Sequence, residues 1–277
     1  MDINVALPIL YTVFVFIIGS AVSSFTWRFP LRSEREWQLE AKHILESSRD
    51  TSSAHKTLES DIDTPPSFTS GRSICPKCNH TLGFLDLIPV LSFILHKGRC
   101  RHCESPISPR YLLIEISFAV ISFPLILLTS SPLQFASLFL IFLSLFIAAV
   151  IDIENKWIPD ECSLMIIASS FVALLLNAQP LADNVLGLIC GYALVYFLRL
   201  FYLHFRQIEA IGLGDAKLLA AIGAWLGFSN LPYVIMFAAS LGMIGALIIR
   251  ATRSTRIPFG PFLVISSISL FYYLRLT

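Results

Sequence analysis

The sequence has few charged residues. They make up 14% of its 277 residues, whereas about 25% is usual for soluble domains. Hydrophobic residues make up 55% and occur in long uninterrupted runs. This scarcity of charge argues against a soluble globular domain and favours a membrane protein. The net charge is only +1, whereas a protein that binds nucleic-acid phosphates usually has an excess of basic residues. No nucleic-acid partner is therefore expected.

The amino-terminal end lacks basic residues. Residues 1–5 contain no Lys or Arg, whereas Arg28, Arg32 and Arg35 follow the first apolar run at 6–26. A cleaved signal peptide normally has a positively charged leading end. We therefore expect a retained first span with the N-terminus outside.

Eight apolar segments are candidates for membrane crossing, which requires about 20 residues. They cover 6–26, 111–129, 133–152, 161–178, 183–204, 215–229, 231–250 and 259–276. The sixth is short and would be tilted, partly re-entrant or sheltered by its neighbours. The sequence predicts an all-α polytopic membrane protein with about eight transmembrane helices.

The distribution of basic residues predicts the orientation. With the N-terminus outside, all basic residues except Arg275 fall on one side, in segments 27–110, 153–160, 199–217 and 250–258. The positive-inside rule makes that side cytoplasmic.

The chain shows no fixed-period repeat, and its apolar runs suggest three parts. We expect a first span at 1–26, a cytoplasmic loop at 27–110 and a seven-span domain at 111–277. Within the loop, 51–72 is rich in Ser, Thr, Asp and Pro and reads as a linker. Gly187 with Gly191 and Gly223 with Gly227 have the small-xxx-small spacing of closely packed helices.

Four cysteines form two CxxC pairs in the cytoplasmic loop, Cys75 with Cys78 and Cys100 with Cys103. Such pairs can place four thiolates around one Zn²⁺, which leaves no open position for substrate. The pattern predicts a small zinc-ribbon-like insertion with a structural metal. The alternative is redox-active or free thiols, because disulfides are disfavoured in the cytoplasm. Two further cysteines in apolar segments, Cys162 and Cys190, are interpreted as small buried hydrophobes.

Two aspartates occur at the ends of apolar segments. Asp152 ends the run from 133, and Asp215 follows Gly212-Leu-Gly214 at the start of the sixth segment. Each has a simple alternative, as an interface residue or as a helix cap. Both are nevertheless expected at the cytoplasmic membrane edge, where they could meet. Two carboxyls in one site support general acid and base chemistry, and the two glycines would let a substrate strand approach closely.

The chain resembles the bacterial type IV prepilin peptidases, which are GxGD aspartic membrane proteases. The resemblance rests on the order and combination of several motifs over nearly all of the sequence. They are Gly19-Ser20 near Arg28-Phe-Pro30, the two CxxC pairs, Ile88-Pro89 with Ser92, Lys97-Gly-Arg-Cys100, Ile107-Ser-Pro-Arg-Tyr111 with Glu115, Ile151-Asp152, Ile158-Pro-Asp160, Gly212-Leu-Gly-Asp215-Ala-Lys217 and Pro258-Phe-Gly-Pro261.

The resemblance implies that Asp152 and Asp215 are catalytic and that the substrates are type IV prepilins and type II secretion pseudopilins, cut in the inner membrane. It also implies N-methylation of the new pilin N-terminus with S-adenosylmethionine. After Gly19-Ser20 the family usually has Asn where this chain has Ser23.

The neighbours of the two aspartates allow more than one interpretation. Glu154 and Asp160 could support the site or could be solvated acidic residues of a loop. Lys217 could support the site electrostatically or could be a lysine at the membrane interface. A different class of function is a zinc-ribbon transporter that uses Asp152 and Asp215 as cation or proton sites. A third is a membrane-anchored adapter whose zinc knuckle binds partners.

Overall fold

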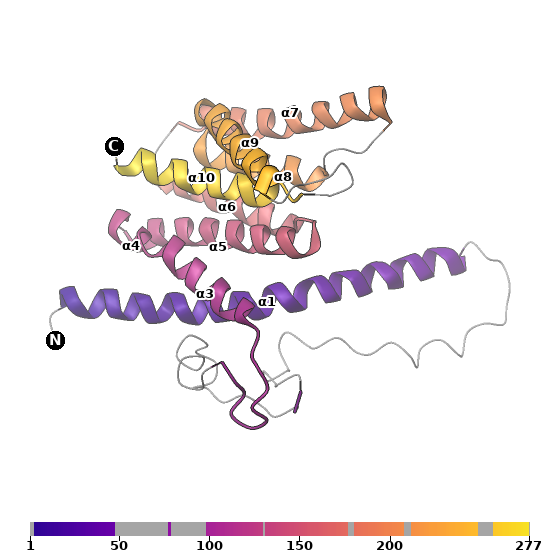
Figure 1. Ribbon diagram of the computed structural model, residues 1–277. Coiled ribbons are helices and arrows are strands. Elements are labelled where there is room, and N and C mark those ends of the chain that lie inside the picture. Colours follow the sequence, from indigo (N-terminus) through magenta and orange to yellow (C-terminus); the bar gives the residue numbers. More distant parts are fainter. Residues whose placement is uncertain are drawn as a thin grey trace. The chain divides into compact units, whose positions relative to one another are not determined.

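The computed structural model describes residues 3–47, 77–78, 98–129, 131–176, 180–207, 212–248 and 257–276 (Figure 1). Within these ranges the chain is predominantly helical, as predicted, and its β-structure is one isolated bridge between Arg99 and Pro106. The expected linker at 51–72 and Cys75 lie outside the described residues.

Every expected span coincides with helical structure. The elements are α1 (Ile3–Ser47), α3 (Pro109–Ser122), α4 (Leu125–Leu128), α5 (Pro132–Asn155), α6 (Asp160–Leu176), α7 (Ala182–Arg206), α8 (Leu213–Leu226), the short 3₁₀ helix η1 (Phe228–Asn230), α9 (Leu231–Ile248) and α10 (Gly260–Leu276). The segment expected at 111–129 is divided between α3 and α4. Helix α1 runs 45 residues and continues well past the expected span.

Five helical segments of the described chain are long and apolar enough to cross a membrane. They are Leu10–Leu45, Pro109–Leu128, Pro132–Asn155, Ala182–Arg206 and Phe228–Ile248. Helices α6 and α10 have 17 residues each, and α8 has 14. The protein is therefore a multi-pass helical membrane protein, while the number of eight spans remains a prediction.

The chain forms two compact units. One combines Met1–Val15 with Phe118–Thr277, and the other is Phe16–Ser117. Helices α1 and α3 contribute to both. The three domain ranges expected from the sequence remain a prediction.

An aromatic cluster ties three helices of the first unit together. The ring of Phe142 in α5 lies 5.7 Å from Trp225 in α8 and 5.6 Å from Phe271 in α10, between ring centroids. Tyr272 joins the cluster at 5.5 Å from Phe142. Phe142 itself is fully buried. Aromatic contacts of this kind contribute about 0.5–1.5 kcal/mol each beyond area burial, so the cluster fixes the C-terminal end of α8 against α5 and α10.

Helices α7 and α8 cross at unusually short range. A Cβ on Gly223 would overlap the backbone of Gly187, and a Cβ on Gly191 would lie 2.8 Å from the carbonyl oxygen of Leu219. The side chain of Asn184 also donates to the Ala224 carbonyl oxygen at 2.9 Å. Small residues permit this approach between membrane helices.

Gly227 lies at the end of α8 and also packs closely against α7. It ends α8 with φ of 85°, and a Cβ there would overlap Asp183. Gly227 therefore leaves room for Asp183 of α7 and also ends α8, where only Gly adopts this backbone conformation at low cost.

Helices α1 and α3 approach within the second unit at Gly19 and Glu115. A Cβ on Gly19 would lie 3.3 Å from the Cα of Glu115. Arg110 crosses to α1, where it donates to the Ser23 carbonyl oxygen at 3.2 Å and to Thr26 Oγ1 at 3.0 Å. These contacts fix the start of α3 against α1.

We expect Gly223→Ala to destabilise the protein by about 1–3 kcal/mol, because overpacking forces a closely packed contact apart. Gly242→Ala is the matched control, since a Cβ there would meet only the Phe262 and Phe259 rings at 3.6 Å or more. That control should be neutral or slightly stabilising. Thermal unfolding in detergent checks both. Equal midpoints for the two variants would show that the α7–α8 crossing does not limit stability.

Candidate active site

Asp152 lies in the last turn of α5 and is 5% exposed. The helix ends three residues later at Asn155, and Lys156 adopts a left-handed conformation with φ of 62°. Its backbone N–H donates to the Asp152 carbonyl oxygen at 3.0 Å, which closes the helix. Asp152 is thus a buried carboxyl held on a well-defined helix end.

Asp215 lies in the first turn of α8, whose N-cap residue is Gly212. Its side chain accepts a hydrogen bond from the backbone N–H of Gly212. This contact resembles one arm of a capping box, in which the N3 side chain accepts from the N-cap backbone N–H, and it fixes the Asp215 side chain at the helix start. The helix-cap interpretation of Asp215 is therefore correct as far as position is concerned, and it does not exclude a chemical role.

The structure brings the two aspartates together. They lie close enough for the charge of Asp152 to act on Asp215. Two nearby carboxyls resist simultaneous ionisation, so they tend to share one proton. Such a pair could supply both a proton donor and a proton acceptor, which is the requirement for aspartic-protease chemistry.

Gly260 completes the site, and the sequence interpretation gave it no role. Its backbone N–H, at the start of α10, donates to Asp152 Oδ2 at 2.9 Å. A Cβ on Gly260 would lie 2.6 Å from the same oxygen. Only glycine therefore lets the α10 backbone approach the carboxyl. The signal in the sequence was the Pro258-Phe-Gly-Pro261 motif, which the resemblance contained without assigning a function.

Ile158 fills the space between the helix ends. It follows α5, is 7% exposed, and lies against both Gly214 and Gly260. A Cβ on Gly214 would lie 3.2 Å from Ile158 Cβ, and one on Gly260 would lie 3.1 Å from Ile158 Cδ1. The side chain thus packs between the starts of α8 and α10 and supports both.

Lys217 is engaged by Asp160. Lys217 Nζ lies 2.6 Å from Asp160 Oδ2, and the two side chains are 40% and 58% exposed. Exposed ion pairs contribute about 0–1 kcal/mol, so the pair orients the lysine toward the start of α6 more than it stabilises the fold. Glu154 is exposed in the last residues of α5. The roles of Glu154 and Lys217 in catalysis remain predictions.

The described part of the cysteine motif gathers three sulfurs. Those of Cys78, Cys100 and Cys103 lie within 4.8 Å of one another. The second knuckle is a tight turn, in which the Cys100 N–H donates to the Ser105 carbonyl oxygen at 2.9 Å.

The chemistry of this cluster suits a metal. Cys103 Sγ lies 3.1 Å from Ser105 Oγ, and hydrogen bonding by Ser105 lowers the pKa of the Cys103 thiol. Thiolate is the form that binds metal. The cluster could therefore hold a metal ion.

Two neighbouring carboxyls at the helix ends of a multi-pass helical membrane protein are the arrangement expected of a polytopic aspartic hydrolase, and comparisons with known proteins specify the family. Residues 13–129 match the bacterial peptidase A24 N-terminal domain, and residues 138–247 match the type IV leader peptidase family.

Full-length relatives agree with these matches. A prepilin leader peptidase/N-methyltransferase of Aeromonas salmonicida is 34% identical, over 96% of this chain and 92% of the relative. A type 4 prepilin-like proteins leader peptide-processing enzyme of Escherichia coli O78:H11 is 33% identical, over 96% and 94%. A prepilin leader peptidase/N-methyltransferase of Neisseria gonorrhoeae is 31% identical, over 98% and 93%. The chain belongs to the type IV leader peptidase family. No solved structure matches it.

We expect Gly260→Ala to lower the rate of peptide cleavage by about 100-fold, because a displacement near 1 Å at a reacting group has an effect of this size. The added Cβ would push Asp152 Oδ2 or the start of α10 out of place. Cleavage rates at matched amounts of folded protein provide the measurement, with Gly242→Ala as the control. Cleavage by Gly260→Ala at the parent rate would exclude a role for this contact.

Proposed function

We propose that this protein is a membrane aspartic endopeptidase of the bacterial inner membrane. It removes the leader peptides of type IV prepilins and type II secretion pseudopilins at the cytoplasmic face, with its own N-terminus periplasmic. The observation that carries the proposal is the pairing of Asp152 with Asp215 at converging helix ends. The predicted orientation, with basic loops on the cytoplasmic side, supports the location.

The chemistry follows from the shared proton. One carboxyl, protonated, donates a hydrogen bond to the scissile carbonyl oxygen. The other, ionised, takes a proton from the attacking water. The hydrogen bond from Gly260 orients Asp152, and that from Gly212 orients Asp215.

The position of the pair defines the reachable bond. Both carboxyls lie at helix ends, so they act on a peptide bond at the membrane edge and not at its middle. A helical bond has its backbone groups already paired, so the scissile segment must be extended locally. The exposed Gly212 offers it a backbone without a side chain, whereas the missing side chain of Gly214 leaves room for Ile158. Lys217 and Glu154 are proposed as supporting residues around this approach.

The three parts predicted from the sequence describe the proposed organisation. The first span is 1–26, the cytoplasmic loop with the tetracysteine motif is 27–110, and the peptidase domain is 111–277. Both carboxyls belong to the last part. A transporter that uses the same aspartates is not favoured, because they lie at helix ends and transporter sites lie near the bilayer midplane.

N-methylation of the new pilin N-terminus is the second proposed activity. S-adenosylmethionine would supply the methyl group. The second unit offers polar groups suited to a charged ligand, namely the buried Glu115 carboxyl and the buried Ser23 hydroxyl, which has no hydrogen-bond partner among the described residues. Arg110 and Thr26 lie beside Ser23 on the same face. These residues fit the amino-acid part of such a cofactor.

The proposed metal is one structural Zn²⁺ held by Cys75, Cys78, Cys100 and Cys103. The three described sulfurs support it through their mutual distances. Four-thiolate sites are closed to substrate, so the metal would stabilise the cytoplasmic loop and take no part in cleavage.

We predict that Asp152→Asn and Asp215→Asn each abolish leader removal, because an amide can neither take a proton from water nor share one. Residual activity should be at least about 1,000-fold lower. The measurement incubates the detergent-purified protein with a membrane-inserted prepilin and follows the leader.

Glu161→Gln is the matched control, since it makes the same carboxyl-to-amide change on an exposed acidic residue outside the pair. It should keep activity within a few-fold. Full cleavage by both dyad variants would rule out the aspartic mechanism.

We predict that the purified protein carries one Zn²⁺ per chain and that Cys100→Ser loses it, because a closed zinc site requires all four ligands. Cys162→Ser, in the buried face of α6, should retain the metal. Elemental analysis under reducing, chelator-free conditions decides between the outcomes. Metal-free parent protein, or equal zinc in both variants, would contradict the ribbon.

A further inference from the structure

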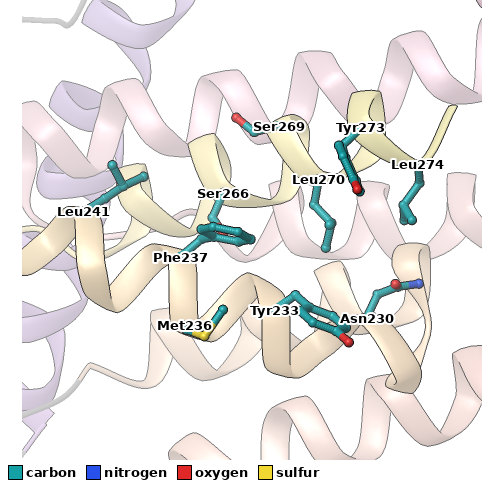
Figure 2. A pocket seen from close by; sticks show the side chains of 10 residues that line it. All are labelled: Asn230, Tyr233, Met236, Phe237, Leu241, Ser266, Ser269, Leu270, Tyr273 and Leu274. Atoms are coloured by element: carbon teal, nitrogen blue, oxygen red, sulfur yellow. The ribbon is translucent and has the colours of Figure 1, made fainter. Parts of the chain in front are cut away.

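Helix α10 presents two different sides to its surroundings. Its first residue, Gly260, contacts Asp152, whereas Ser266, Ser269 and Tyr273 line a groove of about 720 Å³ against α9 on its other side (Figure 2). The groove is therefore not part of the carboxyl site. That site lies where the end of α5, the starts of α8 and α10, and the connection from α5 to α6 meet.

The connection from α5 to α6 spans 156–159 and follows the helix end that carries one of the paired carboxyls. Its side chains contact the start of α8. Ile158 lies against Gly214, where an added Cβ would be 3.2 Å from that of Ile158. Asp160, the first residue of α6, places its Oδ2 atom 2.6 Å from Lys217 Nζ. One apolar contact and one ionic contact thus join this connection and its end to α8.

The two residues of α8 that receive these contacts flank Asp215. Gly214 precedes it directly, and Lys217 follows two positions later. Residues two positions apart do not face each other on a helix. The ammonium of Lys217 accordingly points toward α6, while the Asp215 carboxyl lies beside Asp152. The chain that leaves one carboxyl therefore contacts α8 on both sides of the other.

Other contacts of α8 lie further along the helix. A close approach to α7 occurs at Leu219, and the ring contact of Trp225 with Phe142 is at the far end. At about 1.5 Å per residue, these positions are roughly 6 Å and 15 Å from Asp215 along the helix axis. Helix ends fray more readily than helix centres, so contacts at the first turn decide how precisely Asp215 is placed.

The ion pair at this turn fixes a direction more than it adds stability. The side chains of Lys217 and Asp160 are 40% and 58% exposed, and pairs of this kind contribute little to the free energy of unfolding. A hydrogen bond between two charged groups is nevertheless short and directional. Displacements near 1 Å at a reacting group slow catalysis strongly, so the contact affects the rate of cleavage even where unfolding is unaffected.

We propose that Asp160 is a positioning residue for peptide cleavage, because it holds the first turn of α8 in place through Lys217. This inference rests on the proposed peptidase function. The first turn of α8 carries Asp215, so its position determines how the paired carboxyls meet. Asp160 itself neither takes nor gives a proton in the reaction. Removing its charge therefore lowers kcat, which depends on the alignment of the pair, and leaves KM unchanged.

Cleavage of a membrane-inserted prepilin by Asp160→Asn tests this role. We expect kcat to fall about tenfold, with KM within about twofold of the parent value. The midpoint of thermal unfolding should move by no more than about 3 °C. Asp160→Glu keeps the carboxylate and should retain most of kcat. Glu161→Gln, on the neighbouring exposed carboxyl, is the control and should change neither constant.

Two results would overturn the proposal. Parent kcat in Asp160→Asn would show that the charge at this position does not affect cleavage. An equal loss in Asp160→Glu would show that the carboxylate is not what positions the site.

A double-mutant cycle with Lys217→Met identifies the contact itself. Residues that act through one contact give non-additive losses, so Asp160→Asn combined with Lys217→Met should be no slower than the slower single variant. Losses that multiply to about 100-fold would show independent roles and reject the ion pair as the cause. Failure of the parent protein to cleave at all would reject the peptidase function instead, so the two failures are distinguishable.

Discussion

The contact between the backbone N–H of Gly260 and Asp152 Oδ2 joins the start of α10 to the end of α5. It exists because no side chain stands between the backbone and the carboxyl. Buried carboxyl oxygens need hydrogen-bond partners, and a helix start supplies N–H groups that have none within the helix. Ile158 packs against both Gly260 and Gly214. The end of α5 and the starts of α8 and α10 therefore depend on one another for their positions.

The far ends of the same helices are held by different forces. Helix α8 has only 14 residues, and a short helix depends on packing more than on its own hydrogen bonds. Rings of Phe142, Trp225 and Phe271 hold its C-terminal end, and the glycine crossing with α7 holds its side. Asp215 is therefore positioned by a helix that its neighbours fix in place, which is what a catalytic carboxyl requires.

Much of the fold and part of the site could be predicted from the sequence. Long apolar runs must form helices in a bilayer, because every backbone polar group needs a partner there. The predicted segments accordingly coincide with helices, and the short sixth run is the 14-residue α8. The CxxC spacing likewise indicated the cluster of Cys78, Cys100 and Cys103, whose second knuckle at Cys100–Cys103 is a local turn. The local conformation of a short segment is determined mainly by its own residues.

Contacts between distant segments were decided only by the tertiary structure. The sequence determined that Asp152 and Asp215 lie at ends of apolar segments, and so made their meeting possible. It could not show that Gly260 donates to Asp152 across 108 positions, or that Asp160 engages Lys217. It also could not show that Gly227 ends α8 with a positive φ. Hydropathy and residue spacing predict which segments are buried in lipid and which local structure they form. Contacts with residues of other helices depend instead on how the helices pack against one another.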